Sequence, residues 1–489
     1  MIWDKITLSR FAVLMSMSTL WTQGFAQGHA AIQAQNQVAA PASIQTEGPT
    51  TIGNPRVLTL DESIQIAIKE ASAVLKAESD TEVRAEQLVQ GYLQFLPSLI
   101  VQGGYNKFRG RNFLATAAPT LVRGSSSGTN YQVSTTLNIF NGLGDISAYK
   151  SIRNKKSAAD KTFDRAKQQI ALDVAQSFLQ VILDAKVLQI AKDNLKTSQD
   201  RERLLDAQSK VGTRSLADLF RQQAQTSADQ SSLISTQNRF ESDKILLLRR
   251  LRLDPRSNIA FQEPIFNNDI VTLRQANSSP LSSDALTQEA LNNRPDLDAS
   301  QKLAAASRED VKFAQAPFLP RLDFVATYGS LTRDFDFQRV NGVDVTPTNQ
   351  DSVGKQLADH TNATYGLAVT WNVFDRWVTR SNVAVARGIA YRSKIDAEDY
   401  RNQVIGEVRQ VVVDRNASVQ QLVTSQVGLT AAQKAFEVTE GRFSVGALSF
   451  VDLSAAQTAL FQAQTSFAQA LIGYELQKRA LAYVLGTGV

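Results

Sequence analysis

The fold of this chain is decided by a nine-residue stretch, VGALSFVDL at residues 445–453, and by an earlier version of it, VGTRSLADL at residues 211–219. The two agree at five of nine positions. Their glycines, Gly212 and Gly446, suit the left-handed residue just past a helix end, where a side chain would be strained. Each stretch therefore carries a signal that ends a helix.

A signal that starts a helix follows at once. Ser215 and Ser449 are predicted N-caps, and Asp218 and Asp452 stand three residues further on, at the spacing of a capping box. Because one helix ends and another begins within a few residues, each stretch is predicted to be the tip of a helical hairpin.

The two tips belong to a duplicated unit. An offset of 234 positions carries Val211 to Val445, and likewise Tyr131 to Tyr365, Asn138 to Asn372, Phe140 to Phe374 and Leu251 to Leu485. Upstream, an offset of 223 carries Asp61 to Asp284, Ala67 to Ala290 and the Phe-Leu-Pro triplet at 95–97 to 318–320. The offsets differ by 11, which predicts an insertion between Pro320 and Tyr365. One long unit is used twice, and this repeat governs the fold.

The composition favours long helices and argues against several classes of function. The 489 residues include only 25 glycines and 12 prolines. The net charge of +5 comes without a concentrated basic patch, which argues against a nucleic-acid partner. Cysteine is absent, so disulfides and thiol chemistry are excluded. No nucleophile, metal cluster or phosphate loop stands out, and we predict that the protein is not an enzyme and needs no cofactor.

The N-terminal residues predict export. Lys5 and Arg10 precede a short apolar run, and small residues stand before a cut after Ala26, so residues 1–26 are a predicted signal peptide. Residues 27–57, rich in Ala, Gln, Thr and Pro, are predicted to be flexible. Since no later stretch has eighteen consecutive apolar residues, a membrane-spanning part would have to consist of strands.

Helical patterns occupy most of the remaining chain. Residues 145–210 and 377–444 run without a breaker, and at 1.5 Å per residue each helix would be about 100 Å long. Their apolar residues recur at spacings of three and four, which predicts one buried stripe on each. Shorter helices, which would stack end to end along the long ones, are predicted at 61–95, 215–251, 284–313 and 449–485.

The convincing strands form two hairpins. Apolar and polar side chains alternate from Tyr131 to Ile139 and again from Tyr365 to Val373, with partner strands starting at Leu99 and Leu322. Polar loops are expected at 109–130 and at about 334–362, which leaves about ten residues per strand, enough to cross a bilayer when tilted. An edge hairpin on a soluble core is the alternative. Four strands cannot close a barrel alone, but association of several chains would remove the open edges.

Aromatic residues on these strands have two possible roles. They form part of a membrane aromatic girdle, or they simply prefer strands. The residues are Tyr105, Tyr328, Tyr365 and Trp371.

The predicted boundaries divide the chain into five parts. They are the signal peptide at 1–26, the flexible segment at 27–57, a first structural repeat at 58–253, a linker at 254–283 and a second structural repeat at 284–486.

Strand, long helix, Val-Gly-x-x-Ser-x-x-Asp-Leu tip and half-length helix therefore occur twice, in that order, behind a signal peptide. This pattern resembles the TolC-type outer-membrane factor family, the outer membrane efflux proteins of Gram-negative bacteria. The resemblance covers roughly residues 58–486. It includes the motif Asn-Arg-Pro-Asp-Leu at 293–297, the Phe-Leu-Pro entries to the strands, and Asn-Ile-Phe at 138–140 with Asn-Val-Phe at 372–374.

The resemblance implies a mainly α fold with a small β part. Tandem-duplicated helical hairpins would form a trimeric α-barrel across the periplasm, and four strands per chain would contribute to a twelve-stranded transmembrane β-barrel in outer-membrane lipid. The implied function is a passive, gated exit channel of a tripartite efflux or type I secretion system. Its implied partners are two further copies of the chain, a periplasmic adaptor protein and, through the adaptor, an inner-membrane transporter.

The resemblance also implies roles for the tips. A gate is implied at Asp452 and Asp218, where a ring of carboxylates would favour cations, while helix capping is the alternative role of both. Adaptor contacts are implied for Gly212, Arg214, Ser215, Leu219, Gly446, Ser449 and Leu453. The arginine that often follows the second-copy glycine by two residues in this family is Leu448 here, and Arg214 holds that place in the first copy.

Two other classes of protein stay open at this stage. A secreted or periplasmic coiled-coil structural protein would show strict heptads and no membrane strands. A periplasmic adaptor would carry one helical hairpin inserted in β-rich domains, whereas this chain has two hairpins in tandem.

Overall fold

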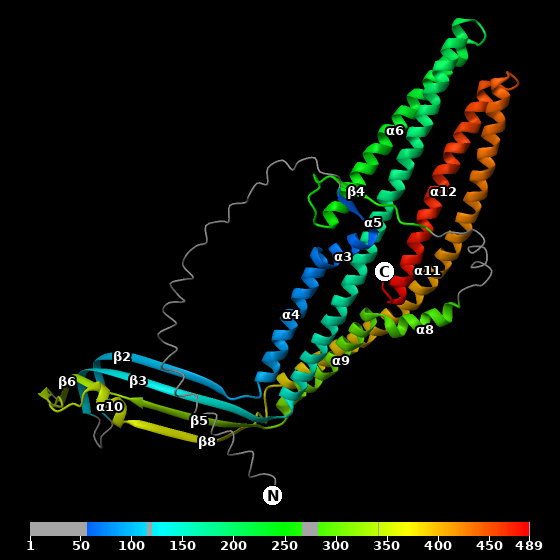
Figure 1. Cartoon of the computed structure of the whole chain (residues 1–489). Coiled ribbons are helices and arrows are strands. Elements are labelled where there is room, and N and C mark those ends of the chain that lie inside the picture. The colour runs from blue at the N-terminus through cyan, green and yellow to red at the C-terminus, as the bar shows by residue number, and fades with distance from the viewer. Residues whose placement is uncertain (1–55, 115–119, 267–281, 341, 489) are drawn as a thin grey trace. The chain divides into compact units, whose positions relative to one another are not determined.

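The computed structural model describes residues 56–114, 120–266, 282–340 and 342–488. The predicted signal peptide, nearly all of the predicted flexible segment and residues 267–281 of the linker lie outside these ranges. The described chain is built around two long helical hairpins joined to one antiparallel sheet (Figure 1).

The two long helices are α5 (Gly144–Lys210) and α11 (Val378–Ser444), each of 67 residues. Their bounds agree with the prediction to within one residue, and their length is about 100 Å. The predicted stripe is buried on both, as Val174 and Phe178 on α5 and Val404 and Val408 on α11 illustrate. The continuous apolar stripe gives each helix a packing surface along its length.

The return helices are α6 (Leu216–Arg250) and α12 (Phe450–Leu485). Helix α6 packs against α5, and α12 packs against α11. In each pair the long helix and its return helix are the two arms of a hairpin, and the turn between them is the tip (Figure 1).

The two shorter predicted helices are each broken in two, so the prediction of single helices at 61–95 and 284–313 was wrong. The first consists of α3 (Leu60–Glu70) and α4 (Ser72–Leu93), and the second of α8 (Ser283–Asn293) and α9 (Pro295–Gln315).

The breaks fall at Ala71 and Arg294, which are equivalent in the two copies, and both residues have extended backbone. Pro295 explains the second break, because proline disfavours helical geometry in the residue before it. The first break has no proline. There, the bend lets Ile64 from α3 and Val74 from α4 enter the same core.

The short helices lie along the sheet-proximal half of the long ones. Helix α4 packs on α5, and α9 packs between α5 and α11 (Figure 1). Where α3 approaches the end of α6, a two-stranded sheet forms from β1 (Arg56–Leu58) and β4 (Ile259–Phe261), over a core that contains Leu58, Phe178 and Leu251. The described part of the linker therefore lies where the stacked helices meet.

The main sheet has the strand order β2, β3, β5 and β8, and all neighbours are antiparallel. Its long strands are β2 (Ser98–Leu114), β3 (Thr120–Asn141), β5 (Arg321–Leu331) and β8 (Thr361–Thr370). Short elements follow in the insertion of the second copy: β6 (Asp334–Val340), β7 (Val343–Asp344) and the helix α10 (Val353–Asp359). A 3-10 turn, η1 (Ala316–Phe318), leads into β5.

Two of the predicted loops are therefore largely structured. Strands β2 and β3 contain 17 and 22 residues and occupy most of the predicted loop at 109–130. The second predicted loop contains β6, which pairs with β3 between Val122 and Ser127. The prediction relied on the alternation of apolar and polar residues, which the Ser- and Gly-rich segment does not have. That segment is nevertheless a strand, because backbone hydrogen bonds pair it with its neighbours.

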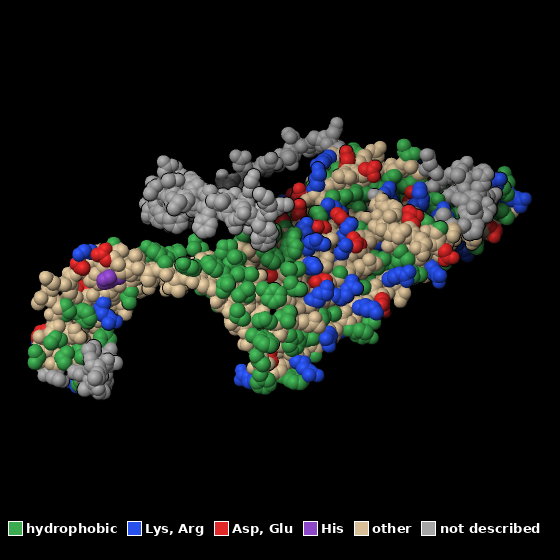
Figure 2. Space-filling model, turned by 90° about the horizontal axis from the view of Figure 1, so that it is seen from below, with side chains coloured by type: hydrophobic (Ala, Val, Ile, Leu, Met, Phe, Trp, Pro, Cys, Tyr) green, Lys and Arg blue, Asp and Glu red, His purple; other side chains and the backbone are tan. Residues whose placement is uncertain are grey.

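The register gives the sheet one apolar face. One row across four strands holds Val101, Val133, Tyr328 and Ala363, and the next holds Leu99, Thr135, Ala326 and Tyr365. This face is uncovered in the single chain, where Leu99 is 72% exposed and Val369 70% exposed. Figure 2 shows hydrophobic side chains gathered on the sheet and beside it, while charged side chains are spread over the helices.

No helix in the described ranges is both long enough and apolar enough to cross a membrane.

Candidate functional site

Both tips end their long helices in the predicted way. Gly212 and Gly446 have φ of 75° and 77°, in the left-handed region that glycine tolerates best. The N–H of the following residue donates to a carbonyl five residues back, from Thr213 to Gln208 and from Ala447 to Arg442, which satisfies orphan carbonyls at the helix end. The two tips, which are similar in sequence, therefore also have the same backbone conformation at the end of the long helix.

The two return helices start differently. Ser449 Oγ accepts from the Asp452 N–H at 3.2 Å, and an Asp452 carboxylate oxygen accepts from the Ser449 N–H at 3.2 Å, which forms the predicted capping box. Ser215 caps its helix through the Ala217 N–H at 3.1 Å, and the predicted capping box with Asp218 is not formed. Asp218 instead faces Arg221, with 3.7 Å between the charged atoms.

This difference predicts unequal effects of removing the two serines. Ser449→Ala should destabilise the first turn of α12 by about 1 kcal/mol, because the serine is one half of a reciprocal pair. Amide hydrogen exchange in residues 450–453 should then be about fivefold faster. Ser215→Ala is the matched control and should change exchange at the start of α6 by less. Equal changes of exchange rate in the two helices would contradict the reciprocal cap assigned to Ser449 and Asp452.

The tips of one chain are held together by a small core. It contains Leu205, Leu219, Phe443, Phe450 and Leu453. Leu219 and Leu453 are buried in this core, so in this conformation they join the hairpins to each other and offer little surface to a partner. The adaptor contact of these two leucines stays a prediction, and it would require a conformation in which they are exposed.

Arg214 also joins the two tips. Its Nη2 donates to the Phe443 carbonyl at 2.8 Å, and its guanidinium lies 4.4 Å from the centre of the Phe443 ring. Arg214 therefore connects the first tip to the end of α11, although Leu448 stands at the corresponding position of the second tip.

A polar cluster joins the same hairpins a few helical turns above the tips. Arg201 on α5 donates to Gln457 Oε1 on α12, and its second terminal nitrogen lies 3.6 Å from Glu440 Oε1 on α11. Gln457 in turn donates to Ser198 Oγ at 3.2 Å, and Ser198 donates to the Asp229 carboxylate on α6 at 2.5 Å. The cluster therefore connects four helices, α5, α6, α11 and α12, which come from both structural repeats of the chain.

The cluster is withdrawn from water. Arg201 is 8% exposed, and burial lowers its pKa, an effect that Glu440 partly offsets. The sequence reasoning missed this group because Asp200, Arg201, Glu202 and Arg203 resemble a solvated charge run. A signal was available, however: continuing the apolar stripe of α5 from Leu195 in two steps of three reaches Ser198 and Arg201.

The Asn-Arg-Pro-Asp-Leu motif forms a second buried polar group, where α9, α5 and α11 meet. The Asp296 carboxylate receives hydrogen bonds from Arg294 at 2.7 Å and from the Tyr400 hydroxyl at 2.8 Å, and it pairs with Arg165 Nε at 2.9 Å. Arg294 also donates to Glu407 on α11. Burial would raise the pKa of Asp296, but its hydrogen bond to Arg294 and the charge of Arg165 hold that pKa below its usual value.

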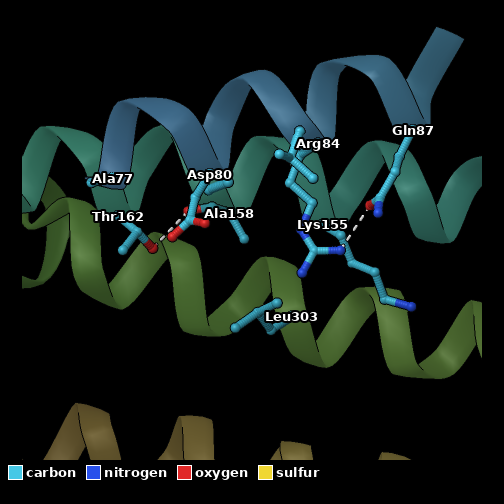
Figure 3. Close-up of a pocket in the computed structure, with 10 residues that line it drawn as sticks. Ala77, Asp80, Arg84, Gln87, Lys155, Ala158, Thr162 and Leu303 are labelled. Carbon is cyan, nitrogen blue, oxygen red and sulfur yellow. Dashed lines mark hydrogen bonds between the residues drawn. The ribbon is translucent and has the colours of Figure 1, made fainter. Parts of the chain in front are cut away.

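A cavity of about 590 Å³ lies between α4, α5 and α9 (Figure 3). Arg84 on its rim donates to Gln87 at 2.8 Å, and Lys155 pairs with Asp310 at 3.0 Å. These charges are already engaged within the chain. In the part of the chain that the structure describes, no group of three or more His, Cys, Asp or Glu side chains could hold a metal ion.

All four residues of the predicted aromatic girdle are exposed. Tyr328 lies in the row of Val101, and Tyr365 in the row of Leu99, on the apolar face of the sheet. Trp371, just beyond β8, donates from Nε1 to the Phe318 carbonyl at 3.1 Å. The sequence reasoning missed further exposed aromatic residues where sheet and helices meet, which are Tyr92, Phe95, Phe318, Phe374 and Trp377.

A sheet with a bare apolar face, continued by two helical hairpins with paired tips, is the architecture expected of a membrane channel. Comparison with known proteins agrees. The family model described as "Outer membrane efflux protein" matches residues 63–249 and 286–487. The chain belongs to the outer membrane efflux protein family.

Several members are similar over most of their length. "Outer membrane protein TolC" of Escherichia coli (strain K12) is 21% identical over 419 residues, which cover 84% of this chain and 79% of TolC. "Pyoverdine export outer membrane protein OpmQ" of Pseudomonas putida is 24% identical over 451 residues, covering 88% and 86%. The solved CmeC outer membrane channel of Campylobacter jejuni superposes with a TM-score of 0.72 at 16% identity, covering 88% and 86%.

These similarities confirm the predicted family and localisation, and the mainly α fold with a small β part. The protein is an exit channel of the outer membrane of a Gram-negative bacterium. Its relatives are channels rather than enzymes. A secreted coiled-coil structural protein and a periplasmic adaptor, the two alternatives, are thereby set aside.

Proposed function

We propose that three copies of this chain close one channel and that this channel is the outer-membrane part of a tripartite efflux or type I secretion system. The observation that carries the proposal is the open sheet. Among the described long strands, β2 pairs only with β3 and β8 only with β5, so the four long strands leave two free edges. Joining β8 of one copy to β2 of the next would give twelve long strands and remove both of these edges.

The helices support the same closure. Helix α4, at one side of the helical layer, exposes Val83, Val89 and Tyr92. Helix α11, at the other side, exposes Val385 and Tyr391. Large apolar side chains on two outer helices are what a contact between neighbouring copies would bury.

The tips support docking of a periplasmic adaptor, which would link the channel to an inner-membrane transporter. Val211 and Val445 are strongly exposed at the two turns. A groove of about 620 Å³ runs between α6 and α12 beside the tips, and its floor includes the small residues Ala224, Ser454 and Ala455. Small side chains allow close approach of another helix, such as one from an adaptor hairpin.

The gate in this proposal is a threefold ring of Asp452 at the periplasmic mouth, with Asp218 near it. Asp452 is exposed, although its carboxylate also caps α12. A ring of three carboxylates would attract cations and repel anions.

Asp452→Ala should therefore raise the conductance of single channels in a planar bilayer about twofold and weaken their preference for cations. Because the substitution also removes the helix cap, Ser449→Ala is the matched control: it loses the cap and keeps the carboxylate. The control should retain wild-type ion selectivity. Unchanged conductance and selectivity in Asp452→Ala would leave Asp452 as a cap only, and absence of any conductance from the wild-type protein would contradict the channel itself.

A further inference from the structure

The apolar face of strand β2 continues into a basic ladder. Pairing of β2 with β3 runs without a shift from Ser98 opposite Thr136 to Leu114 opposite Thr120. Alternate residues of an unshifted strand share one face, so Lys107, Arg109 and Arg111 stand on the same face as Leu99, Val101 and Tyr105. Along this face the side chains change from aliphatic through aromatic to cationic.

The ladder extends across three strands. Arg111 is directly opposite Arg123 on β3, and Arg123 is directly opposite Arg339 on β6. Side chains on facing positions are about 5 Å apart at Cβ, and like charges there repel one another. A row of three arginines is therefore destabilising unless an anion lies between them.

The carboxylates nearby only partly balance these charges. Asp336 lies 2.9 Å from Lys107 and accepts from Ser125 at 2.7 Å. Asp344 lies 3.9 Å from Arg339. Within the ranges that the structure describes, Arg109, Arg111 and Arg123 form no ion pair, and all three are exposed.

The position of the ladder matches a membrane boundary. From Ser98, where β2 begins beside the helices, to Lys107, the first cation of the ladder, a strand rising 3.4 Å per residue covers about 31 Å, or about 23 Å along the membrane normal at a tilt of 40°. This is close to the height of the apolar band of a transmembrane barrel. The row of Arg111 lies about 14 Å further along β2, at the end of the sheet away from the helices.

We propose that the basic ladder, with the row Arg111, Arg123 and Arg339 at its centre, binds the phosphate groups of anionic glycolipid in the outer leaflet of the outer membrane. The inference rests on the proposed function, because it requires the sheet to cross that membrane. Guanidinium groups bind phosphate oxygens through two parallel hydrogen bonds. A phosphate between the three arginines would replace their repulsion by attraction, and acyl chains attached to it would lie along the exposed apolar face below.

The test titrates the detergent-solubilised, full-length protein with diphosphoryl lipid A and with its dephosphorylated form, and counts bound lipid by native mass spectrometry. Wild-type protein should bind the phosphorylated lipid at least tenfold more tightly. The variant R111Q/R123Q/R339Q should lose at least tenfold in that affinity. The matched control K192Q/K196Q/R203Q removes the same charge from exposed positions of α5 and should stay within twofold of wild type.

Any of three results would overturn the proposal. The first is equal binding of the two lipids by the wild-type protein, and the second is unchanged binding by the arginine variant. The third is displacement of the lipid by millimolar inorganic phosphate, which would show a site for free anions. The same preparations are tested for conductance in planar bilayers. If the arginine variant conducts normally but the lipid results fail, only the lipid site is wrong. If the wild-type protein itself does not conduct, the proposed channel is wrong.

Discussion

Asp296→Ala is expected to destabilise the folded chain by about 3–5 kcal/mol, the usual effect of breaking a buried ion pair from one side. The reason is the number of charges that depend on this carboxylate. Arg294, which is 3% exposed, and Arg165 would both remain buried after losing it. The midpoint of thermal unfolding, followed by circular dichroism in detergent, should fall by several degrees.

Asp298→Ala is the matched control for this variant. Asp298 lies on the same turn of α9, but its side chain is 39% exposed and its partner Lys161 is 3.8 Å away. An exposed pair of this kind contributes at most about 1 kcal/mol. Equal shifts of the unfolding midpoint in the two variants would contradict the importance assigned to the Asn-Arg-Pro-Asp-Leu motif.

The same group predicts a dependence on pH. Since the folded chain holds the pKa of Asp296 below its ordinary value, the stabilisation is fully present above the unfolded pKa of about 3.9 and is lost as pH falls through the folded value. Wild-type stability should therefore decline below about pH 4. Asp296→Asn should decline less steeply over that range, because it has no carboxylate to protonate.

Arg201→Ala is expected to loosen the two hairpins from each other and to raise channel conductance severalfold. The arginine joins α5 to both helices of the second hairpin, through Gln457 and Glu440. Hydrogen bonds of charged groups contribute about 1.5–3 kcal/mol each, and loss of this one also leaves Gln457 with fewer partners in a buried site. With this contact between the hairpins lost, and only the apolar core and Arg214 left to join the tips, the mouth between the tips should widen.

Arg203→Ala controls for the loss of a positive charge nearby. The Arg203 side chain is 77% exposed, and among the described residues it pairs only along its own helix, with Asp200. Single channels of this variant should conduct as the wild type does. A wild-type conductance in Arg201→Ala would show that the buried cluster stabilises the chain without restricting the mouth.

The duplication made most of the helical fold predictable. Two copies of a tip motif located four helix ends, and the absence of breakers located the long helices, because helix length and termination follow from local sequence. The breaks at Ala71 and Arg294 were harder to foresee. Pro295 gave a signal for one of them, but the bend at Ala71 depends on a core assembled from distant residues such as Phe178 and Leu251.

The sheet and the candidate site show where local patterns are insufficient. The C-terminal half of β2 and the N-terminal half of β3 lack apolar alternation. They are strands because they pair with each other and because β3 also pairs with β6. The contacts of Arg201 with Gln457 and of Arg214 with Phe443 join residues more than 200 positions apart. Such contacts depend on how the two hairpins pack, which no local spacing of residues encodes.

The measurement that tests the central proposal most directly is the mass of the particle that detergent extracts from isolated outer membranes. Native mass spectrometry or light scattering corrected for detergent would give the number of chains per particle. We expect three chains, as closure of the open sheet requires. A stable particle of one or two chains would contradict the shared barrel, and the exposed apolar face of the sheet would then need a different explanation.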